Sequence, residues 1–509
     1  LLFYGTGYLM ASSITTASII GLDARPVTVE ADISNGLPAL VLVGLPDTAV
    51  QEARERVKSA IKHSINDFPK TRVTVNLAPA DVKKVGTPFD LPISLVILAE
   101  HGTIKSESLA GLLVAGELSL DGSLRPVHGA LSFALLAKGL GMKQLILPTE
   151  NGPEAALVEG IDVRTANHLR EIIKSLKGKF ELPPAESATL TESPIIHPDF
   201  SAIRGQAQAK RALEVAAAGG HNILLQGPPG SGKTLLARSF PSILPRLSLD
   251  EVLEVTRIHS VAGLLPKQSI VRERPFRAPH HSASGISLVG GGTIPRPGEI
   301  SLAHRGVLFL DEFLEFPRDV LETLRQPLED GAVTVSRAAG AVTFPARFSL
   351  IGAMNPCPCG FATDPDRPCV CPPLHLLRYQ KKLSGPLLDR IDLFLEVPKL
   401  PTHDLTNHLE AEPSSIIRER VERARRIQRE RLATTKLQTN AEMTSEQVRR
   451  TITLTSEAQV LLKHAIERYQ LSGRSYFRLL KVGQTIADLA NQKEVQAEHI
   501  AEALSYRQG

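Results

Sequence analysis

One stretch of the chain, "NILLQGPPGSGKTLLARSF" at 222–240, restricts the possible folds more than any other. An apolar run, Ile223–Leu225, enters "GPPGSGKT", which fits G-x-x-x-x-G-K-[ST] at every fixed position, and a helical pattern follows. Gly227, Gly230 and Gly232 allow the backbone to curl so that its N–H groups face phosphate oxygens. This order predicts a phosphate-binding loop in an α/β domain. A chance match in a glycine-rich loop is the alternative.

The same loop supplies the residues expected to hold a nucleotide. Lys233 can reach the β- and γ-phosphates of ATP, and Thr234 can hold Mg²⁺. The predicted contacts are Gly227, Pro228, Pro229, Gly230, Ser231, Gly232, Lys233 and Thr234.

Two further apolar runs end in polar residues. In "GVLFLDEF" (306–313), Asp311 is expected to bind the Mg²⁺ shell and Glu312 to polarise the attacking water. The alternative is a buried strand with two solvent-facing acids at its end. "FSLIGAMNP" (348–356) includes Asn355, whose amide could orient that water, unless it is an ordinary turn residue.

Arg390 lies in "SGPLLDRIDLF" (384–394), close to Asp389 and Asp392. If it is presented to the nucleotide of the next subunit, it would act as an arginine finger. An ion pair within its own chain is the alternative.

Composition limits the class of protein. The chain has 509 residues, 42% of them apolar, and a net charge of +4, so nucleic-acid binding would need local basic patches. No stretch reaches the roughly 18 apolar residues of a membrane span. The apolar start lacks a basic region, which predicts no signal peptide, no membrane anchor and a cytoplasmic protein.

Changes of pattern divide the chain into parts. Residues 1–9, before Met10, are interpreted as an added remnant or a mis-assigned start. An α+β pattern covers 10–179, and a linker rich in Pro, Ser, Thr and Glu covers 180–197. Strand–loop–helix repeats over 198–400 predict a parallel sheet, and a helical pattern covers 401–509.

Five segments together resemble the magnesium-chelatase-like YifB/ComM family of AAA+ ATPases. They are "IRGQAQAKRALEVAAAGGHNILLQGPPGSGKT", "FRAPHHSAS", "AHRGVLFLDEF", "NPCPCG" and "SGPLLDRIDL", and the resemblance runs from about Ala17 to the C-terminus. It implies a multidomain α/β fold: an α+β Lon-protease-like (S5-like) N-domain, an AAA+ P-loop NTPase core with a parallel sheet, and an α-helical lid.

The resemblance also implies a function. ComM proteins are bacterial hexameric motors that drive DNA branch migration during natural transformation. We therefore expect an ATP- and Mg²⁺-dependent helicase or translocase that forms a homo-hexamer on single-stranded or branched DNA. Asn355 matches the sensor 1 residue of such motors, and Arg390 matches their arginine finger. The alternative is a chelatase-type remodelling ATPase without a DNA substrate.

Four more residues receive roles from the resemblance. Ile203 and Gln206, in "IRGQ", would lie near the adenine. Arg474, in "LSGRSYFRLL", is the expected sensor 2 arginine at the start of a lid helix, with Arg478 as the second choice.

The N-domain resembles Lon protease without its catalytic pair. The segment that resembles the serine region of Lon, Gly86–Asp90, contains no serine, and Leu131 falls where the lysine belongs. Without a nucleophile and its base, Ser–Lys acyl transfer has no mechanism. We expect a non-proteolytic scaffold or interaction domain. Thr87 as a substitute nucleophile would lack a visible base.

Two segments are candidate DNA contacts. The stretch 329–350 predicts a β-hairpin with Arg337 at its tip, which in this clade points into the hexamer channel. The glycine-rich 280–304 resembles a helix-2 insert and offers Arg296. A solvated loop is the alternative for both. The arginine-rich stretch 416–432 predicts a salt-bridged, solvated helix more than a phosphate-tracking face.

All four cysteines follow Asn355 in the pattern C-x-C-x₉-C-x-C. Cys357, Cys359, Cys369 and Cys371 could hold tetrahedral Zn²⁺, which would stiffen this loop. The C-x-C spacing is tighter than the usual C-x₂₋₄-C. Packing of free thiols and a redox pair are the alternatives.

Overall fold

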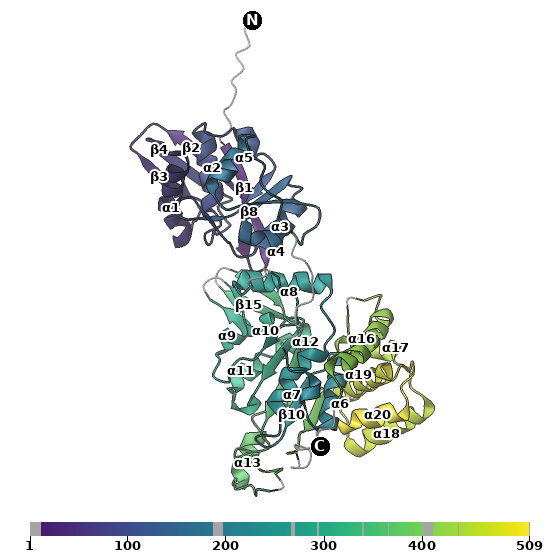
Figure 1. Cartoon of the computed structure of the whole chain (residues 1–509). Coiled ribbons are helices and arrows are strands. Elements are labelled where there is room, and N and C mark those ends of the chain that lie inside the picture. Colours follow the sequence, from purple (N-terminus) through teal and green to yellow (C-terminus); the bar gives the residue numbers. More distant parts are fainter. Residues whose placement is uncertain are drawn as a thin grey trace. The chain divides into compact units, whose positions relative to one another are not determined.

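The computed structural model describes residues 12–186, 197–265, 270–292, 295–337, 340–364, 366–400, 411–435 and 437–507. They form two compact units (Figure 1). The first contains the residues up to 186 together with 249–265, 270–272 and 295–296, and the second contains the other described residues. A segment that follows the P-loop in sequence thus belongs to the first unit. The predicted remnant 1–9 and most of the predicted linker lie outside the described residues.

A seven-stranded mixed sheet is the frame of the first unit, in the order β3-β4-β2-β1-β5-β8-β9. Antiparallel pairs join β1 to β2 and β2 to β4, and the other neighbours are parallel. Alternate residues of one strand, such as Val27, Val29 and Ala31 of β2, are buried because successive side chains point to opposite faces. The strands are Ser12–Ile20 (β1), Asp23–Ser34 (β2), Ala39–Val43 (β3), Arg72–Ala78 (β4), Leu112–Val114 (β5), Gln144–Pro148 (β8) and Asp162–Ala166 (β9), and Glu117–Leu118 (β6) pairs with Leu124–Arg125 (β7).

Helices complete the first unit. Asp47 caps the first of them, because its carboxylate accepts a hydrogen bond from the N–H of Val50 at 2.8 Å. Pro183 and Ala185, within the predicted linker, hydrogen-bond to β9, so the ordered unit continues past residue 180. The helices are Thr48–Ile65 (α1), Asp90–Glu100 (α2), Ala130–Gly139 (α3), Gly152–Ala155 (α4), Leu169–Leu176 (α5) and Leu249–Ala262 (α8).

The second unit is built on a five-stranded parallel sheet in the order β11-β14-β17-β10-β18. This confirms the prediction of a multidomain α/β chain with a parallel sheet. The carboxyl ends of parallel strands meet at one edge of a sheet, so the residues that follow β10, β14 and β17 come together. The strands are Ile223–Gln226 (β10), Phe276–Arg277 (β11), Val307–Leu310 (β14), Ser349–Met354 (β17) and Leu393–Glu396 (β18), and nearby helices include Ala207–Gly219 (α6) and Lys233–Ser239 (α7).

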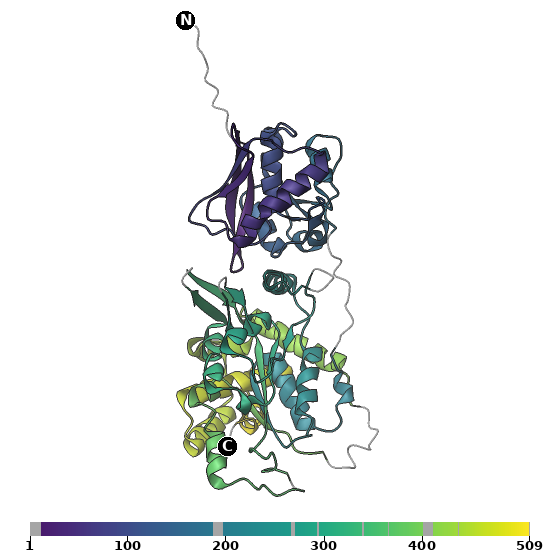
Figure 2. The ribbon, with the colours of Figure 1, turned by 90° about the vertical axis from the view of Figure 1, so that its left-hand side faces the viewer.

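Between β11 and β18 the described chain has short helices, the strand pair Gly290–Gly291 (β12) with Arg296–Pro297 (β13), and a longer hairpin. The hairpin consists of Ala332–Arg337 (β15) and Gly340–Pro345 (β16), and Figure 2 shows it as a separate pair of arrows. The helices of this region are Gly285–Val289 (α9), Glu299–Leu302 (α10), Arg318–Glu322 (α11), Arg325–Asp330 (α12), Pro373–Gln380 (α13) and Gly385–Leu388 (α14).

The C-terminal part of the second unit is helical and lies beside α6 (Figure 1). A buried carboxylate, Asp488, helps to hold it together: Arg431 and Asn440 both donate to its Oδ2, at 3.0 and 2.8 Å, and Gln484 donates to its Oδ1 at 3.0 Å. No helix in the described part of the chain is long and apolar enough to cross a membrane. The helices are Ser414–Arg431 (α16), Ser445–Thr451 (α17), Ser456–Tyr469 (α18), Gly473–Leu489 (α19) and Ala497–Ser505 (α20).

A second buried carboxylate joins α8 to the rest of the first unit. Glu154 is 1% exposed, accepts a hydrogen bond from the N–H of Leu131 at 2.8 Å, and is hydrogen-bonded to the hydroxyl of Ser260 on α8. Burial raises the pKa of the Glu154 carboxyl from 4.5 to about 7, more than these hydrogen bonds lower it. The folded protein therefore holds a proton on Glu154 that the unfolded chain releases above pH 4.5.

We expect the stability of this unit to fall as the pH rises from 4.5 towards 7. Between these two pH values the folded state keeps a proton on Glu154 that the unfolded state releases. The free energy of unfolding therefore falls across this range, by on the order of 3 kcal/mol. Thermal unfolding of Glu154→Gln should show a smaller pH dependence than the unsubstituted protein. The exposed Glu159 gives the matched control, Glu159→Gln. Parallel melting curves for all three proteins would contradict the assignment.

Candidate nucleotide site

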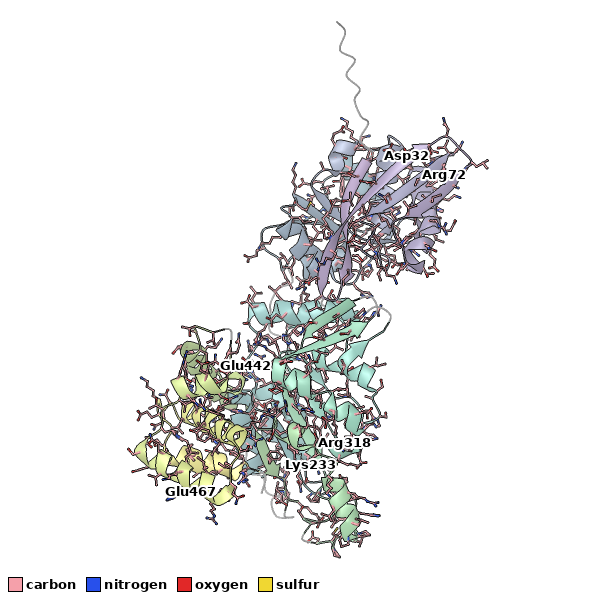
Figure 3. All side chains as sticks on the ribbon, turned by 180° about the vertical axis from the view of Figure 1, so that it is seen from behind. Asp32, Arg72, Lys233, Arg318, Glu442 and Glu467 are labelled. Atoms are coloured by element: carbon pink, nitrogen blue, oxygen red, sulfur yellow. The ribbon has the colours of Figure 1, made fainter. Side chains whose placement is uncertain are left out.

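The P-loop follows β10 directly and has the backbone that its glycines predict. Gly230 and Gly232 have φ angles of 77° and 91°, in the left-handed region that side chains disfavour. Gly227 is needed for close packing, because a Cβ at this position would lie 2.2 Å from the carbonyl oxygen of Val397. Figure 3 labels Lys233, the first residue of α7.

Lys233 connects the P-loop to the neighbouring strand. Its Nζ donates to the carbonyl oxygens of Gly227 and Pro228 at 2.7 and 2.9 Å, and to Oδ1 of Asn355 at 3.4 Å. Lys233 is only 9% exposed. Burial lowers the pKa of its amine, and the negative charge of Asp311 partly offsets this lowering. The structure thus brings Lys233 and Asn355 together, at the ends of β10 and β17.

Thr234 and Asp311 lie together at the same edge of the sheet. The Thr234 hydroxyl donates to Oδ2 of Asp311 at 3.0 Å. A hydroxyl and a carboxylate oxygen are ligands that Mg²⁺ accepts beside nucleotide phosphates. Glu312 follows with φ at 51°, and its N–H donates to Oδ1 of Asp311 at 2.9 Å. A left-handed glutamate is an unfavourable conformation of the kind found at functional sites.

His281 is a neighbour of Glu312 that the sequence predictions missed. Its Nδ1 lies 2.9 Å from Oε2 of Glu312, and its ring packs against His280, with centroids 4.0 Å apart, and edge-on to Phe316. The signal was present, because "APHHS" follows β11, and β11 pairs in parallel with β14, the strand before Glu312. Residues after neighbouring parallel strands share one edge.

The "IRGQ" segment contacts the P-loop through one side chain. Gln206 Nε2 donates to the carbonyl oxygens of Pro398 and Ser231, at 2.8 and 3.3 Å. Ile203 is 3% exposed and packs in the hydrophobic core of the second unit. Both residues therefore lie next to elements that support the nucleotide site.

Arg390 precedes β18, at the sheet edge opposite the P-loop of its own chain. It pairs with Glu329 and lowers the pKa of that carboxyl. This is an ion pair within one chain, with a partner other than Asp389 or Asp392. The pair lines a hollow of about 470 Å³ that is formed by Val289, Glu322, Thr323, Arg325, Gln326, Glu329, Val333 and Arg390.

Arg474 and Arg478 contact the same segment as Arg390. Arg474 lies 3.5 Å from Oδ2 of Asp389, and Arg478 donates to the carbonyl oxygens of Leu388, at 3.0 Å, and Ile391. These residues precede β18, which runs parallel to β10. The P-loop follows the carboxyl end of β10, so the structure places the three arginines towards the opposite edge of the sheet from the P-loop of their own chain.

The predicted hairpin is present. β15 and β16 pair in register from Ala332 with Pro345 to Arg337 with Gly340, so Arg337 lies at the tip end of the ladder. The side chain of Arg337 and the turn at 338–339 lie outside the described residues. Arg296, at the start of the short strand Arg296–Pro297 (β13), is exposed.

Several arginines of α16 make contacts within the chain, whereas Arg423, Arg426 and Arg429 are exposed. Arg420 pairs with Glu214 and Glu412, Arg425 donates to the carbonyl oxygen of Ala217, and Arg418 donates to a backbone carbonyl oxygen. These contacts match the salt-bridged helix that the sequence favours.

In the first unit, the residues that align with the catalytic region of Lon make structural contacts. Asp90 is buried in an ion pair with Arg56 at 2.6 Å, and Leu131 is fully buried in α3. Thr87 is half-buried, and its carbonyl oxygen accepts from the N–H of Asp90.

The four cysteines form one cluster. All four Sγ atoms lie within 4.8 Å of one another. Cys357 is buried, and the other three are half-buried. Hydrogen bonds from backbone N–H groups lower the pKa of Cys359 to about 6, whereas burial raises that of Cys371 to about 12.

Comparison with known proteins gives three matching family models. They are "Magnesium chelatase, subunit ChlI" over residues 199–405, "Subunit ChlI of Mg-chelatase" over 29–151, and "Magnesium chelatase, subunit ChlI C-terminal" over 411–507. The magnesium-chelatase 38 kDa subunit of Cereibacter sphaeroides is 27% identical over 174 residues, which cover 31% of this chain and 52% of that protein.

Two relatives match over almost their whole length. YifB of Escherichia coli K12 is 44% identical over 498 residues, 97% of both chains. The competence protein ComM of Haemophilus influenzae is 44% identical over 494 residues, 96% of both chains. The chain therefore belongs to the YifB/ComM family of magnesium-chelatase-like proteins.

Proposed function

We propose that the protein is an ATP-driven DNA motor, a branch-migration helicase or translocase that works as a homo-hexamer in the cytoplasm and aids the integration of DNA during natural transformation. The observation that carries the ATPase part is the meeting of Lys233, Thr234, Asp311 and Asn355 at one edge of a parallel sheet. The DNA part rests on similarity to a competence protein and on the hairpin β15–β16.

Each residue of the site has a chemical task in this proposal. Lys233 and the P-loop N–H groups bind the phosphates of ATP, and Thr234 and Asp311 hold Mg²⁺, which supplies charge neutralisation at those phosphates. Glu312 accepts the proton of the attacking water, and Asn355 orients that water. His281 holds the Glu312 carboxylate in position, since its Nδ1 is 2.9 Å away.

The distribution of cations supports a shared site. Arg390, Arg474 and Arg478 lie towards the sheet edge opposite their own P-loop, so in one chain they are separated from the phosphates. A ring of head-to-tail copies would bring this edge to the neighbour's P-loop. Arg390 then serves as the arginine finger, after exchange of Glu329 for the γ-phosphate, and Arg474 or Arg478 as the sensor 2 arginine.

The first unit is proposed to be a Lon-like scaffold without protease activity. The fully buried Leu131 offers no base, and Asp90 is neutralised by Arg56. A chelatase-type remodelling ATPase without a DNA substrate is the second candidate, favoured by the ChlI family models across both units.

His281 is predicted to act on the rate of hydrolysis and not on nucleotide affinity. His281→Ala should lower kcat for ATP by about tenfold or more while KM changes little, because a positioning contact to the base is lost. His281→Asn, which keeps a donor, should recover part of the loss. Glu312→Gln is the reference and should cost about 10²–10⁴-fold in kcat. A KM rise of the same size in His281→Ala would contradict the role.

Shared sites predict complementation between two inactive variants. Arg390→Ala lacks the finger and Glu312→Gln lacks the base, so each alone should hydrolyse ATP poorly. Mixed rings contain interfaces in which one chain supplies Glu312 and its neighbour supplies Arg390. Mixing the two proteins and allowing subunit exchange should therefore restore ATPase activity. No recovery in rings shown to be mixed would contradict a finger that acts between subunits.

The DNA function predicts branch migration on a synthetic three- or four-way junction with ATP and Mg²⁺. The protein should displace the labelled strand, and Glu312→Gln should not, although it still binds the junction. Arg337→Ala should weaken DNA binding by about tenfold and flatten its salt dependence, because phosphate contacts release counterions. Arg296→Ala is the comparison on the second candidate segment. ATPase activity that DNA neither stimulates nor uses would favour the chelatase-type candidate instead.

A further inference from the structure

The loop that carries the cysteines begins at the nucleotide site. It begins after Asn355, at the end of β17, and ends where α13 starts at Pro373. Its described residues contain no helix and no strand. An irregular connection of this length is uncommon inside a compact domain unless it has a function or a device that orders it.

The sulfur positions suit one tetrahedral metal ion. A zinc–sulfur bond of about 2.3 Å sets the edge of a tetrahedron of sulfurs at about 3.8 Å. Cys369 lies 3.6 Å from Cys359 and 3.7 Å from Cys357, and Cys357 lies 3.3 Å from Cys359. Cys371 completes the group and accepts a hydrogen bond from the N–H of Cys359. Four sulfurs that can all bind one ion at the corners of a tetrahedron favour Zn²⁺ among the common divalent ions.

The alternatives fit the positions less well. Free thiols that serve packing are small apolar groups set among other apolar side chains. Here the sulfurs contact one another, three of the four residues are partly exposed, and the adjacent Val370 is 79% exposed. A redox pair would need only two cysteines, and this arrangement collects four.

One end of the loop touches the P-loop. Gly360 has φ at 86°, and a Cβ there would lie 2.7 Å from Cδ of Pro229 and 3.9 Å from Cγ of Asn355. The cysteine turn and the phosphate loop are therefore in direct contact, with no room for a side chain between them. Asp366 forms an ion pair with Lys399 at 2.7 Å. Lys399 directly follows Pro398, whose carbonyl oxygen accepts from Gln206.

The segment after α13, the helix that follows the loop, reaches the turn that bears the proposed base. After α13, Lys382 donates to the carbonyl oxygen of Leu314 at 2.8 Å and lies 3.6 Å from Glu315. Leu314 and Glu315 belong to the short helix Phe313–Glu315, which starts directly after Glu312. The cysteine loop thus contacts one wall of the site directly, and the helix that follows it leads to the second wall.

We propose that Cys357, Cys359, Cys369 and Cys371 bind one Zn²⁺, and that this ion holds the loop against Pro229 and so sets the affinity of the P-loop for nucleotide. The metal has no part in hydrolysis. Four thiolates closing this loop remove conformational freedom that the loop would otherwise regain near the phosphates. The second half of this inference rests on the proposed nucleotide site, and the first half does not.

The first test is the metal content of the full-length protein, purified without added metal or chelator. We expect one zinc per chain and, after replacement by Co²⁺, the visible absorption of tetrahedral thiolate coordination. Cys371→Ser and Cys357→Ser should each lose the metal. Val370→Ser changes the exposed residue between two ligands and should retain it. Four freely titrating thiols with no metal, a disulfide, or bound iron in place of zinc would each overturn the proposal.

The second test measures the affinity of the protein for a fluorescent ADP analogue before and after zinc release. A mercurial reagent releases the zinc, and excess thiol then removes the mercurial reagent from the cysteines. We expect the Kd to rise at least tenfold on release and to return when Zn²⁺ is added back. Lys233→Ala should keep its zinc but bind the analogue weakly, so a failure of the nucleotide site is distinguished from a failure of the metal site. Zinc release with unchanged Kd would overturn the coupling.

Discussion

Parallel pairing of β10 with β17 is the interaction on which the candidate site depends. The register sets Gln226 beside Met354, so the next residue of each strand emerges at the same level. The N–H of Gly227 then donates to the carbonyl oxygen of Met354 at 3.2 Å, and Lys233 reaches Asn355. A slip of one residue would turn the side chains of the buried strand to the wrong face, so the core fixes this register.

Much of this arrangement could be predicted, because it depends on short-range patterns and one topological rule. The apolar run before the P-loop, and the acids after "GVLFL", predict strands whose ends share an edge, and the contact of Thr234 with Asp311 follows. Tertiary packing sets the rest. His281 lies in an irregular segment, the ion pair of Arg390 with Glu329 joins residues 61 apart, and the hydrogen bond from Gly129 to Ser260 spans 131 residues. No local periodicity in the sequence predicts contacts between residues so far apart in the chain.

The two edges of the parallel sheet carry different charged residues. One edge presents a phosphate-binding loop with two acids that suit a cation, and the other edge presents Arg390, Arg474 and Arg478 beside β18. A chain with complementary functions on opposite edges favours head-to-tail association, which closes into a ring when the rotation between copies allows it. The same separation explains why Arg390 has a carboxylate partner in a single chain: a guanidinium that is 11% exposed needs a counter-charge.

The proposed shared site would make strict demands on the loops behind it, since misplacing a reacting group by about 1 Å can cost about 10²-fold in rate. Hydrogen bonds of β17 hold Asn355 from one side only, because the chain leaves the sheet at that residue. A long irregular loop would then transmit its motion to Pro229 and, through α13 and Lys382 beyond it, to the turn at Leu314. A cross-link among the four sulfurs would tie the start of this loop to its end, next to the contact with Pro229. The position of the cysteines is thus the one at which a metal would matter most for phosphate binding.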